Sequence, residues 1–113
     1  MVLGDGCEDG LLEPFVAIAY AAAVTSRFRL GTGVCLVPQR QAIYTAKQVA
    51  DCDVLSRGRI DFGVGTGFTA RRAMGFGAIK VKDMETYIRQ VYGLLRRETV
   101  DFEMEGQRKK IRF

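Results

Sequence analysis

The sequence predicts an α/β domain built around parallel strands. Residues 60–67 form an apolar strand that runs into a glycine-rich end, and residues 29–34 repeat this pattern upstream. Between them, residues 41–55 place apolar side chains near helical spacing. A strand, a helix and a strand in so few residues indicate a βαβ unit with parallel strands. We therefore expect both glycine-rich strand ends at one edge of the sheet, facing a ligand.

The other elements continue this β/α order. Residues 2–3 predict the end of a strand, and Pro14–Val24 predicts an alanine-rich helix with proline at its first position. Residues 84–96 predict a helix with a broad apolar stripe, capped by Asp83. Residues 99–113 alternate around a turn and predict a β-hairpin that covers an end or edge of the sheet. The two Gly-x-Gly strand ends form a weak internal repeat of the kind that a β/α barrel produces.

Length and composition limit the chain to one small domain over residues 1–113. Its 113 residues are 48% hydrophobic and 27% charged, as is ordinary for a globular protein. The basic residues are scattered except at 108–110, so we expect no nucleic-acid partner. No apolar run reaches the roughly 18–20 residues of a membrane-spanning helix, so we expect no membrane insertion.

The cysteine and histidine contents narrow the possible chemistry. Cys7, Cys35 and Cys52 form no Cys-x-x-Cys pair and follow no export signal, so we expect free thiols in a cytoplasmic protein. Cys35 and Cys52 lie in apolar patterns and are expected in the core. The chain has no histidine, which excludes Ser-His and Cys-His nucleophiles and most zinc sites. We therefore expect no metal site.

The glycines after the strand at residue 60 have more than one interpretation. Residues 65–70 match the dinucleotide fingerprint G-x-G-x-x-[GA]. The helix after that fingerprint would have to fit within residues 69–74, which is far shorter than a βαβ crossover needs. We therefore do not favour a dinucleotide site. The glycines can instead make tight turns at the mouth of a barrel, or let a ligand approach the backbone.

Two further positions are candidates for ligand contact. The glycines of residues 31–34, Gly-Thr-Gly-Val, permit a β-bulge or an unusual peptide, and hence the close approach of a flat ligand. The same bulge can serve barrel closure alone. Asp5, flanked by glycines at the end of the first strand, can accept a hydrogen bond from a ring N–H or a hydroxyl. It can equally be an ordinary turn aspartate.

An ordered series of motifs resembles one known family. Residues 13–16 (EPFV), 25–34 (TSRFRLGTGV), 53–59 (DVLSRGR) and 62–67 (FGVGTG) resemble the bacterial luciferase-like flavin and deazaflavin oxidoreductases. Residues 94–106 are most similar to the methylenetetrahydromethanopterin reductase branch. This resemblance implies a partial (β/α)₈ TIM barrel, with about three β/α units and a C-terminal β-hairpin. It also implies that the first strand and the second half of the barrel are absent.

The resemblance implies a cofactor site as well. Gly33 and Val34 match a cis peptide bond that backs one face of a flavin or deazaflavin ring, and Leu36 follows at a position that lines the cofactor. Asp5 matches the acidic residue at the end of the family's second strand. Thr66 and Gly67 match the end of the fourth strand, which contacts the cofactor. The cofactor is then coenzyme F-420 or FMN, which exchanges a hydride with a small-molecule substrate.

Two positions depart from some members of the family. Sugar-phosphate dehydrogenases of the family have a histidine after the acid and a glutamate after Thr-Gly, whereas this chain has Gly6 and Phe68. We therefore expect no catalytic side chain, which suits the reductase branch. Two hypotheses remain open. One is an oxidoreductase that works as a homo-oligomer or with the missing barrel half. The other is a truncated, non-catalytic fragment that serves as an assembly or interaction module.

Overall fold

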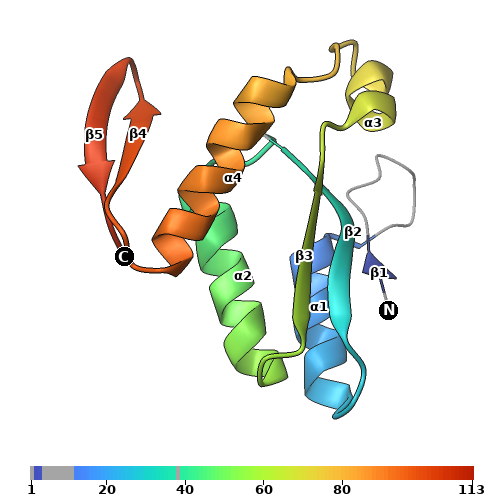
Figure 1. Cartoon of the computed structure of the whole chain (residues 1–113). Coiled ribbons are helices and arrows are strands. Elements are labelled where there is room, and N and C mark those ends of the chain that lie inside the picture. The colour runs from blue at the N-terminus through green and yellow to red at the C-terminus, as the bar shows by residue number, and fades with distance from the viewer. Residues whose placement is uncertain (1, 4–11, 38) are drawn as a thin grey trace.

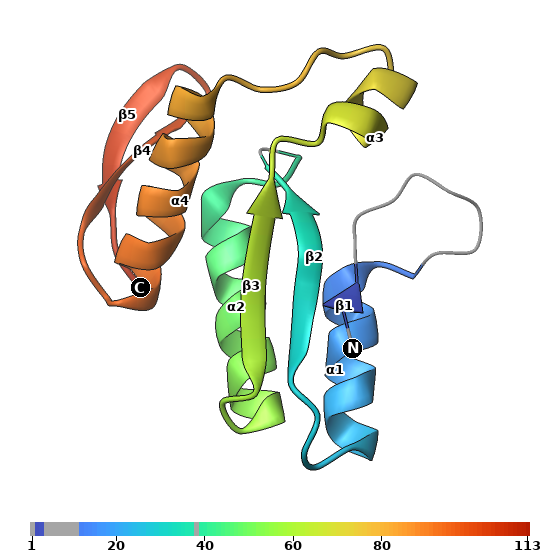
Figure 2. The same ribbon diagram turned by 45° about the vertical axis from the view of Figure 1, so that its right-hand side comes forward.

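The computed structural model describes residues 2–3, 12–37 and 39–113. In chain order its elements are β1 (Val2–Leu3), α1 (Pro14–Val24), β2 (Leu30–Leu36), α2 (Ala42–Ser56), β3 (Ile60–Gly65), α3 (Phe68–Ala73), α4 (Val81–Leu95), β4 (Val100–Met104) and β5 (Gln107–Ile111). Strands β1, β2 and β3 form a parallel sheet in that order, and β4 and β5 form an antiparallel hairpin. Helices α1 and α2 lie along one face of the sheet (Figure 1; Figure 2). The described residues leave the opposite face open.

The parallel βαβ order is confirmed, but several predicted boundaries were wrong. Strand β2 does not stop at Val34 and continues to Leu36. Helix α4 begins at Val81, with Lys80 as its N-cap, so Asp83 lies in the first turn and does not cap the helix. The helix starts earlier because Ile79, directly before the N-cap, packs against the core and holds the chain there. The chain between β3 and α4 contains the short helix α3 (Phe68–Ala73).

Two apolar clusters attach the helices to the sheet. The first joins α1 and α2 to β2, and its buried members are Phe15, Ile18, Ala21, Ala22, Leu30, Cys35, Val49 and Cys52. The second joins α2 to α4, and its buried members are Val37, Ala42, Ala46, Tyr87, Val91 and Leu94. Phe62 of β3 packs against both clusters. Cys35 and Cys52 are buried in the core, as predicted, and Cys7 lies outside the described residues.

Arg59 joins the carboxyl ends of both sheet-covering helices to the start of β2. Its Nε donates to the Ser56 carbonyl at 2.7 Å, and its Nη1 donates to the Phe28 carbonyl at 2.8 Å. Its Nη1 and Nη2 also reach the hydroxyl and carbonyl of Thr25, both at 3.0 Å, and Nη2 donates to the Ala22 carbonyl at 3.1 Å. One half-buried guanidinium thus satisfies carbonyls that helix ends leave without a partner.

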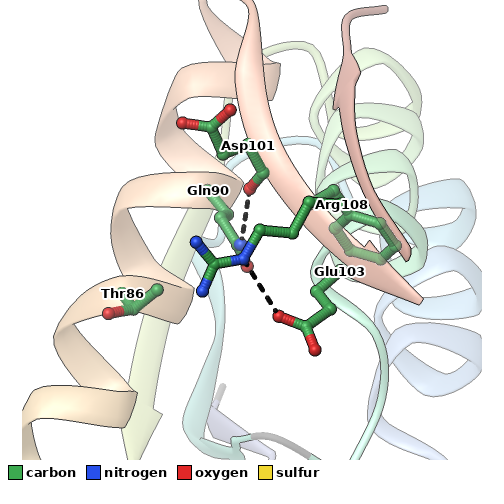
Figure 3. A pocket seen from close by; sticks show the side chains of 6 residues that line it. Thr86, Gln90, Asp101, Glu103 and Arg108 are labelled. Atoms are coloured by element: carbon green, nitrogen blue, oxygen red, sulfur yellow. Dashed lines mark hydrogen bonds and ion pairs between the residues drawn. The ribbon is translucent and has the colours of Figure 1, made fainter. Parts of the chain in front are cut away.

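The hairpin packs on α4, so the prediction that it covers an end or edge of the sheet was wrong. Val100, Phe102 and Ile111 lie against the second cluster, which α4 completes. Gln90 of α4 donates from Nε2 to the Asp101 carbonyl at 2.8 Å. A shallow cavity of about 350 Å³ lies between α4 and the hairpin (Figure 3). Its lining residues lie on α4 and the hairpin, and none lies on the parallel sheet.

Candidate functional site

The carboxyl half of β2 contains a β-bulge at the predicted position. Strand β2 pairs with β3 in register up to Thr32 and again from Cys35, and in between two residues of β2 stand opposite one residue of β3. The two residues are Gly33 and Val34, and the peptide bond between them is cis. Both are exposed, and the Val34 side chain is 38% accessible. The bulge therefore presents an apolar side chain at the carboxyl end of the sheet.

The side-chain hydroxyl of Thr32 makes hydrogen bonds to β3 in place of the backbone hydrogen bonds that the bulge interrupts. Its Oγ1 donates to the Gly63 carbonyl at 2.7 Å and accepts from the Gly63 N–H at 3.0 Å. A Cβ on residue 63 would clash with the Thr32 carbonyl oxygen, so only glycine lets the strands approach this closely. Because the buried Thr32 hydroxyl pairs with both backbone groups, the interruption leaves neither of them without a partner.

Val34 occupies the space beside two glycines of β3. A Cβ on residue 65 would lie 2.5 Å from Val34 Cγ2, and one on residue 63 would lie 3.8 Å from Val34 Cγ1. The first glycine of the Gly-Thr-Gly sequence therefore makes room for a side chain of the neighbouring strand. The need for glycine at position 65 is therefore explained by packing, and no phosphate bound at the backbone is required to explain it.

Gly67 brings the ends of β2 and β3 together. It has φ +72° and is buried, and a Cβ there would lie 3.4 Å from the Cβ of Leu36. Leu36 is itself buried, and Thr66 is half-buried. Helix α3, which follows Gly67, has only six residues. A dinucleotide site needs a longer helix there, which agrees with our preference against that interpretation.

Five of the six predicted cofactor residues lie at these strand ends, namely Gly33, Val34, Leu36, Thr66 and Gly67. The structure brings Val34 next to the end of β3, and Leu36 next to Gly67. Asp5, the sixth, lies outside the described residues. Gly33 and Val34 are both exposed, so an apolar surface lies at this end of β2. In the described part of the chain, no group of histidine, cysteine and acidic residues could hold a metal ion.

An ion pair that the sequence analysis missed secures the end of β2. Arg40 Nη2 lies 2.8 Å from Glu13 Oε1, and Arg40 Nη1 donates to Cys35 Sγ at 3.5 Å. The guanidinium also lies 5.3 Å above the centre of the Phe15 ring. Glu13 caps α1, since its Oε2 accepts from the Val16 N–H at 2.8 Å. Glu13 before proline indicated a helix start in the sequence. Its pairing with Arg40, 27 residues away, could not be predicted from any local pattern.

A second ion pair joins β2 to β3 on the open face. Arg29 Nε and Nη2 donate to Asp61 Oδ2 and Oδ1 at 2.8 and 2.5 Å. These hydrogen bonds hold the pKa of the Asp61 carboxyl below its usual range. In the core, burial raises the pKa of the Cys52 thiol, which keeps that thiol protonated and unreactive. Over the described residues, no helix has the length and apolar character required to cross a membrane.

Known proteins match nearly the whole chain. The family model described as "Luciferase-like monooxygenase" matches residues 3–112. An uncharacterised protein of Mycobacterium tuberculosis is 42% identical over 66 residues, which are 58% of this chain and 23% of that protein. The alkanal monooxygenase alpha chain of Photorhabdus laumondii is 28% identical over 107 residues, 94% of this chain and 30% of that protein. The chain thus spans less than a third of the length of these relatives.

Solved structures share the arrangement of helices and strands. A monooxygenase from Streptomyces bottropensis matches with a TM-score of 0.70 and 29% identity, over 87% of this chain and 31% of that one. The oxygenating constituent of 3,6-diketocamphane monooxygenase from Pseudomonas putida, solved with FMN, has a TM-score of 0.70 at 18% identity, over 97% and 33%. The coenzyme F-420 dependent tetrahydromethanopterin reductase of Methanopyrus kandleri has a TM-score of 0.71 at 22% identity, over 96% and 35%. At these identities, the last two similarities concern the fold alone.

Proposed function

This chain belongs to the luciferase-like monooxygenase family, and we propose that it forms the cofactor-binding part of a flavin- or deazaflavin-dependent oxidoreductase. The reaction is hydride transfer between coenzyme F-420 or FMN and a small organic substrate. The observation that carries this proposal is the bulge at Gly33 and Val34, which presents an exposed apolar side chain at the carboxyl end of the sheet. The FMN complex and the F-420 dependent reductase among the similar structures support both cofactors.

Each predicted residue has a role in this proposal. Gly33 and Val34 back one face of the cofactor ring, and Leu36 fixes the end of β2 against Gly67. Thr66 contacts the cofactor from the end of β3, and Asp5 accepts a hydrogen bond from the ring. When bound, the cofactor supplies the hydride chemistry, and the protein supplies binding and orientation.

We propose that the site is completed by the second half of a barrel, from chain outside these 113 residues or from another copy. The relatives are more than three times longer than the region they share with this chain. The sheet face that carries Val34 is open, and Asp61 on that face is also exposed. In a closed barrel that face points inward and is covered by the opposite strands.

An alternative is a non-catalytic interaction module, which the outer surface of α1 favours. Leu12, Val16, Tyr20 and Val24 lie four residues apart and are 64–74% exposed. This α1 apolar line borders a cavity of about 550 Å³, which Ala17, Ala21 and Thr25 also line. Exposed apolar patches of this kind mark interfaces.

Cofactor titration of the purified chain distinguishes the two candidates. We expect the chain to bind F-420 or FMN saturably, as measured by the change in cofactor fluorescence. Light scattering measures the oligomeric state of the same samples. Val34→Asp places a charge where the ring would lie and should abolish binding. Val54→Asp is the matched control, because it makes the same change at an exposed valine of α2, outside the α1 apolar line. A monomer that binds neither cofactor, or equal losses in both variants, would contradict the cofactor-binding function.

A further inference from the structure

The connection from β3 to α4 is basic. Residues 62–82 contain Arg71, Arg72, Lys80 and Lys82 and no acidic residue. The full chain has 17 basic and 13 acidic residues, so the other 92 residues carry 13 of each sign and are neutral. Residues 106–113 also carry four basic residues and no acidic one, but only residues 62–82 join β3 to α4, and we call them the basic connection.

The basic connection lies at the carboxyl end of the sheet, beside the candidate cofactor site. Helix α3 stands beyond the end of β3, and the chain then crosses to α4 at the same end (Figure 2). The side chain of Arg71 passes over Gly67, since a Cβ on Gly67 would lie 3.1 Å from Arg71 Cγ and 3.4 Å from Leu36 Cβ. The charged segment thus adjoins residues that we place against the cofactor.

Two exposed aromatic rings support the arginines. The guanidinium of Arg72 lies 6.0 Å from the ring centre of Phe68, and that of Arg71 lies 5.6 Å from the ring centre of Phe76. Phe68 and Phe76 are 61% and 59% exposed. Arg71 is engaged further, because its Nε donates to the Gly77 carbonyl at 2.7 Å. Arg72 makes no hydrogen bond or ion pair to any residue that the structure describes, so its fork of donors points to solvent.

Helix stability does not account for all of these charges. Arginines in the last turn of α3 suit the negative end of a helix. Lys80 and Lys82, in contrast, lie at a helix N-terminus, that of α4, where the helix dipole disfavours a cation. Lys80 is the N-cap and makes no side-chain capping bond. The connection thus carries four cations beyond one end of the sheet, two of them against the local dipole, and this charge favours an anionic ligand.

We propose that Arg72 and Phe68 bind an anionic group, phosphate or carboxylate, of a ring-bearing ligand at the carboxyl end of the sheet. The guanidinium can donate two parallel hydrogen bonds to such a group, and the Phe68 ring offers an apolar surface beside it. Arg71, Lys80 and Lys82 add long-range attraction. This inference rests on the proposed function, because the anion belongs either to the cofactor or to the substrate.

Flavin titrations test whether the anion belongs to the cofactor. FMN carries a phosphate that riboflavin lacks, so their dissociation constants are compared for the wild-type chain, Arg72→Gln and Arg112→Gln. Arg112 is a matched control, being an exposed arginine that follows β5 beside the C-terminus, which lies at the far end of α4 from α3 (Figure 1). If Arg72 holds the phosphate, Arg72→Gln should weaken FMN binding about tenfold, the effect of a charge-assisted hydrogen bond, and leave riboflavin binding unchanged. Arg112→Gln should change neither.

A second arm tests whether the anion belongs to the substrate. Phenyl phosphate is added to the chain, with or without riboflavin, and the NMR signals of Arg72 Nε–H and the Phe68 ring are followed. Phenol, which has the same ring but no phosphate, is titrated for comparison. Saturable shifts with phenyl phosphate alone, lost in Arg72→Gln, support a substrate anion. This arm works even if the chain binds no flavin, so the failure of the proposed function is distinguishable. The inference is overturned if Arg72→Gln binds FMN relative to riboflavin as the wild-type chain does and phenyl phosphate does not bind at Arg72.

Discussion

Val34 Cγ2 lies where a side chain on residue 65 would begin, because a Cβ built on Gly65 would come within 2.5 Å of it. Valine branches at Cβ and has few alternative rotamers, so it cannot easily turn aside. The Val34 Cβ itself would lie 3.4 Å from the added atom. The surface that we place against the cofactor ring therefore depends on the missing side chain at position 65.

Replacing Gly65 with alanine should displace Val34. We expect a loss of about 1–3 kcal/mol in the free energy of unfolding, as for other overpacked sites, measured by chemical denaturation. Cofactor affinity should fall as well, because the Val34 surface moves. In the Val34→Ala/Gly65→Ala double variant, the stability should return close to that of Val34→Ala alone. Strictly additive losses in the double variant would show that the two positions are not coupled.

Removing the Arg59 side chain should destabilise the fold without altering the ligand site. Arg59→Met loses five hydrogen bonds to four residues and leaves part-buried carbonyls without these donors. We expect a loss of about 2–4 kcal/mol in thermal or urea unfolding. Arg27→Met, an exposed arginine nearby, should have little effect. A stability loss no greater than that of the control would contradict this role for Arg59.

The ion pair on the open face should make stability depend on acid pH. Hydrogen bonds from Arg29 lower the pKa of Asp61 in the folded state, so their contribution is present above the unfolded pKa of aspartate, roughly 3.9. It is lost as the pH falls through the lower folded value. Asp61→Asn should therefore be less stable than wild type at neutral pH and converge with it in acid. Asp53→Asn, at an exposed aspartate of α2, should run parallel to wild type.

The α1 apolar line should promote association of the purified chain. Tyr20 lies in its middle and is 74% exposed, so Tyr20→Lys should shift sedimentation profiles toward the monomer. Tyr44→Lys is the control, because Tyr44 is a single tyrosine of α2 with 65% exposure. Equal profiles for wild type and Tyr20→Lys would show that the line is not an interface in the isolated chain.

Local sequence determined the elements and their order. Proline after Glu13 marked the start of α1, and the two Gly-x-Gly strand ends around a helical stretch identified the parallel βαβ unit. Hydrophobic periodicity and turn chemistry act over a few residues, so they are visible in sequence. Competing local signals also explain an error: Asp83 suits a helix cap, but packing of Ile79 moved the start of α4 to Val81.

Only the tertiary structure decided which distant groups meet. The contacts of Arg59 with residues 22–28, the pair of Arg40 with Glu13, and the place of Val34 over Gly65 all join separate elements. The place of Val34 over Gly65 also depends on the two-residue bulge in β2, which shifts the strand pairing beyond Thr32. A one-residue change of register moves every side chain to the other face, so spacing along the chain cannot specify these contacts. The elements were therefore predictable, whereas the surface of the site required the packed sheet.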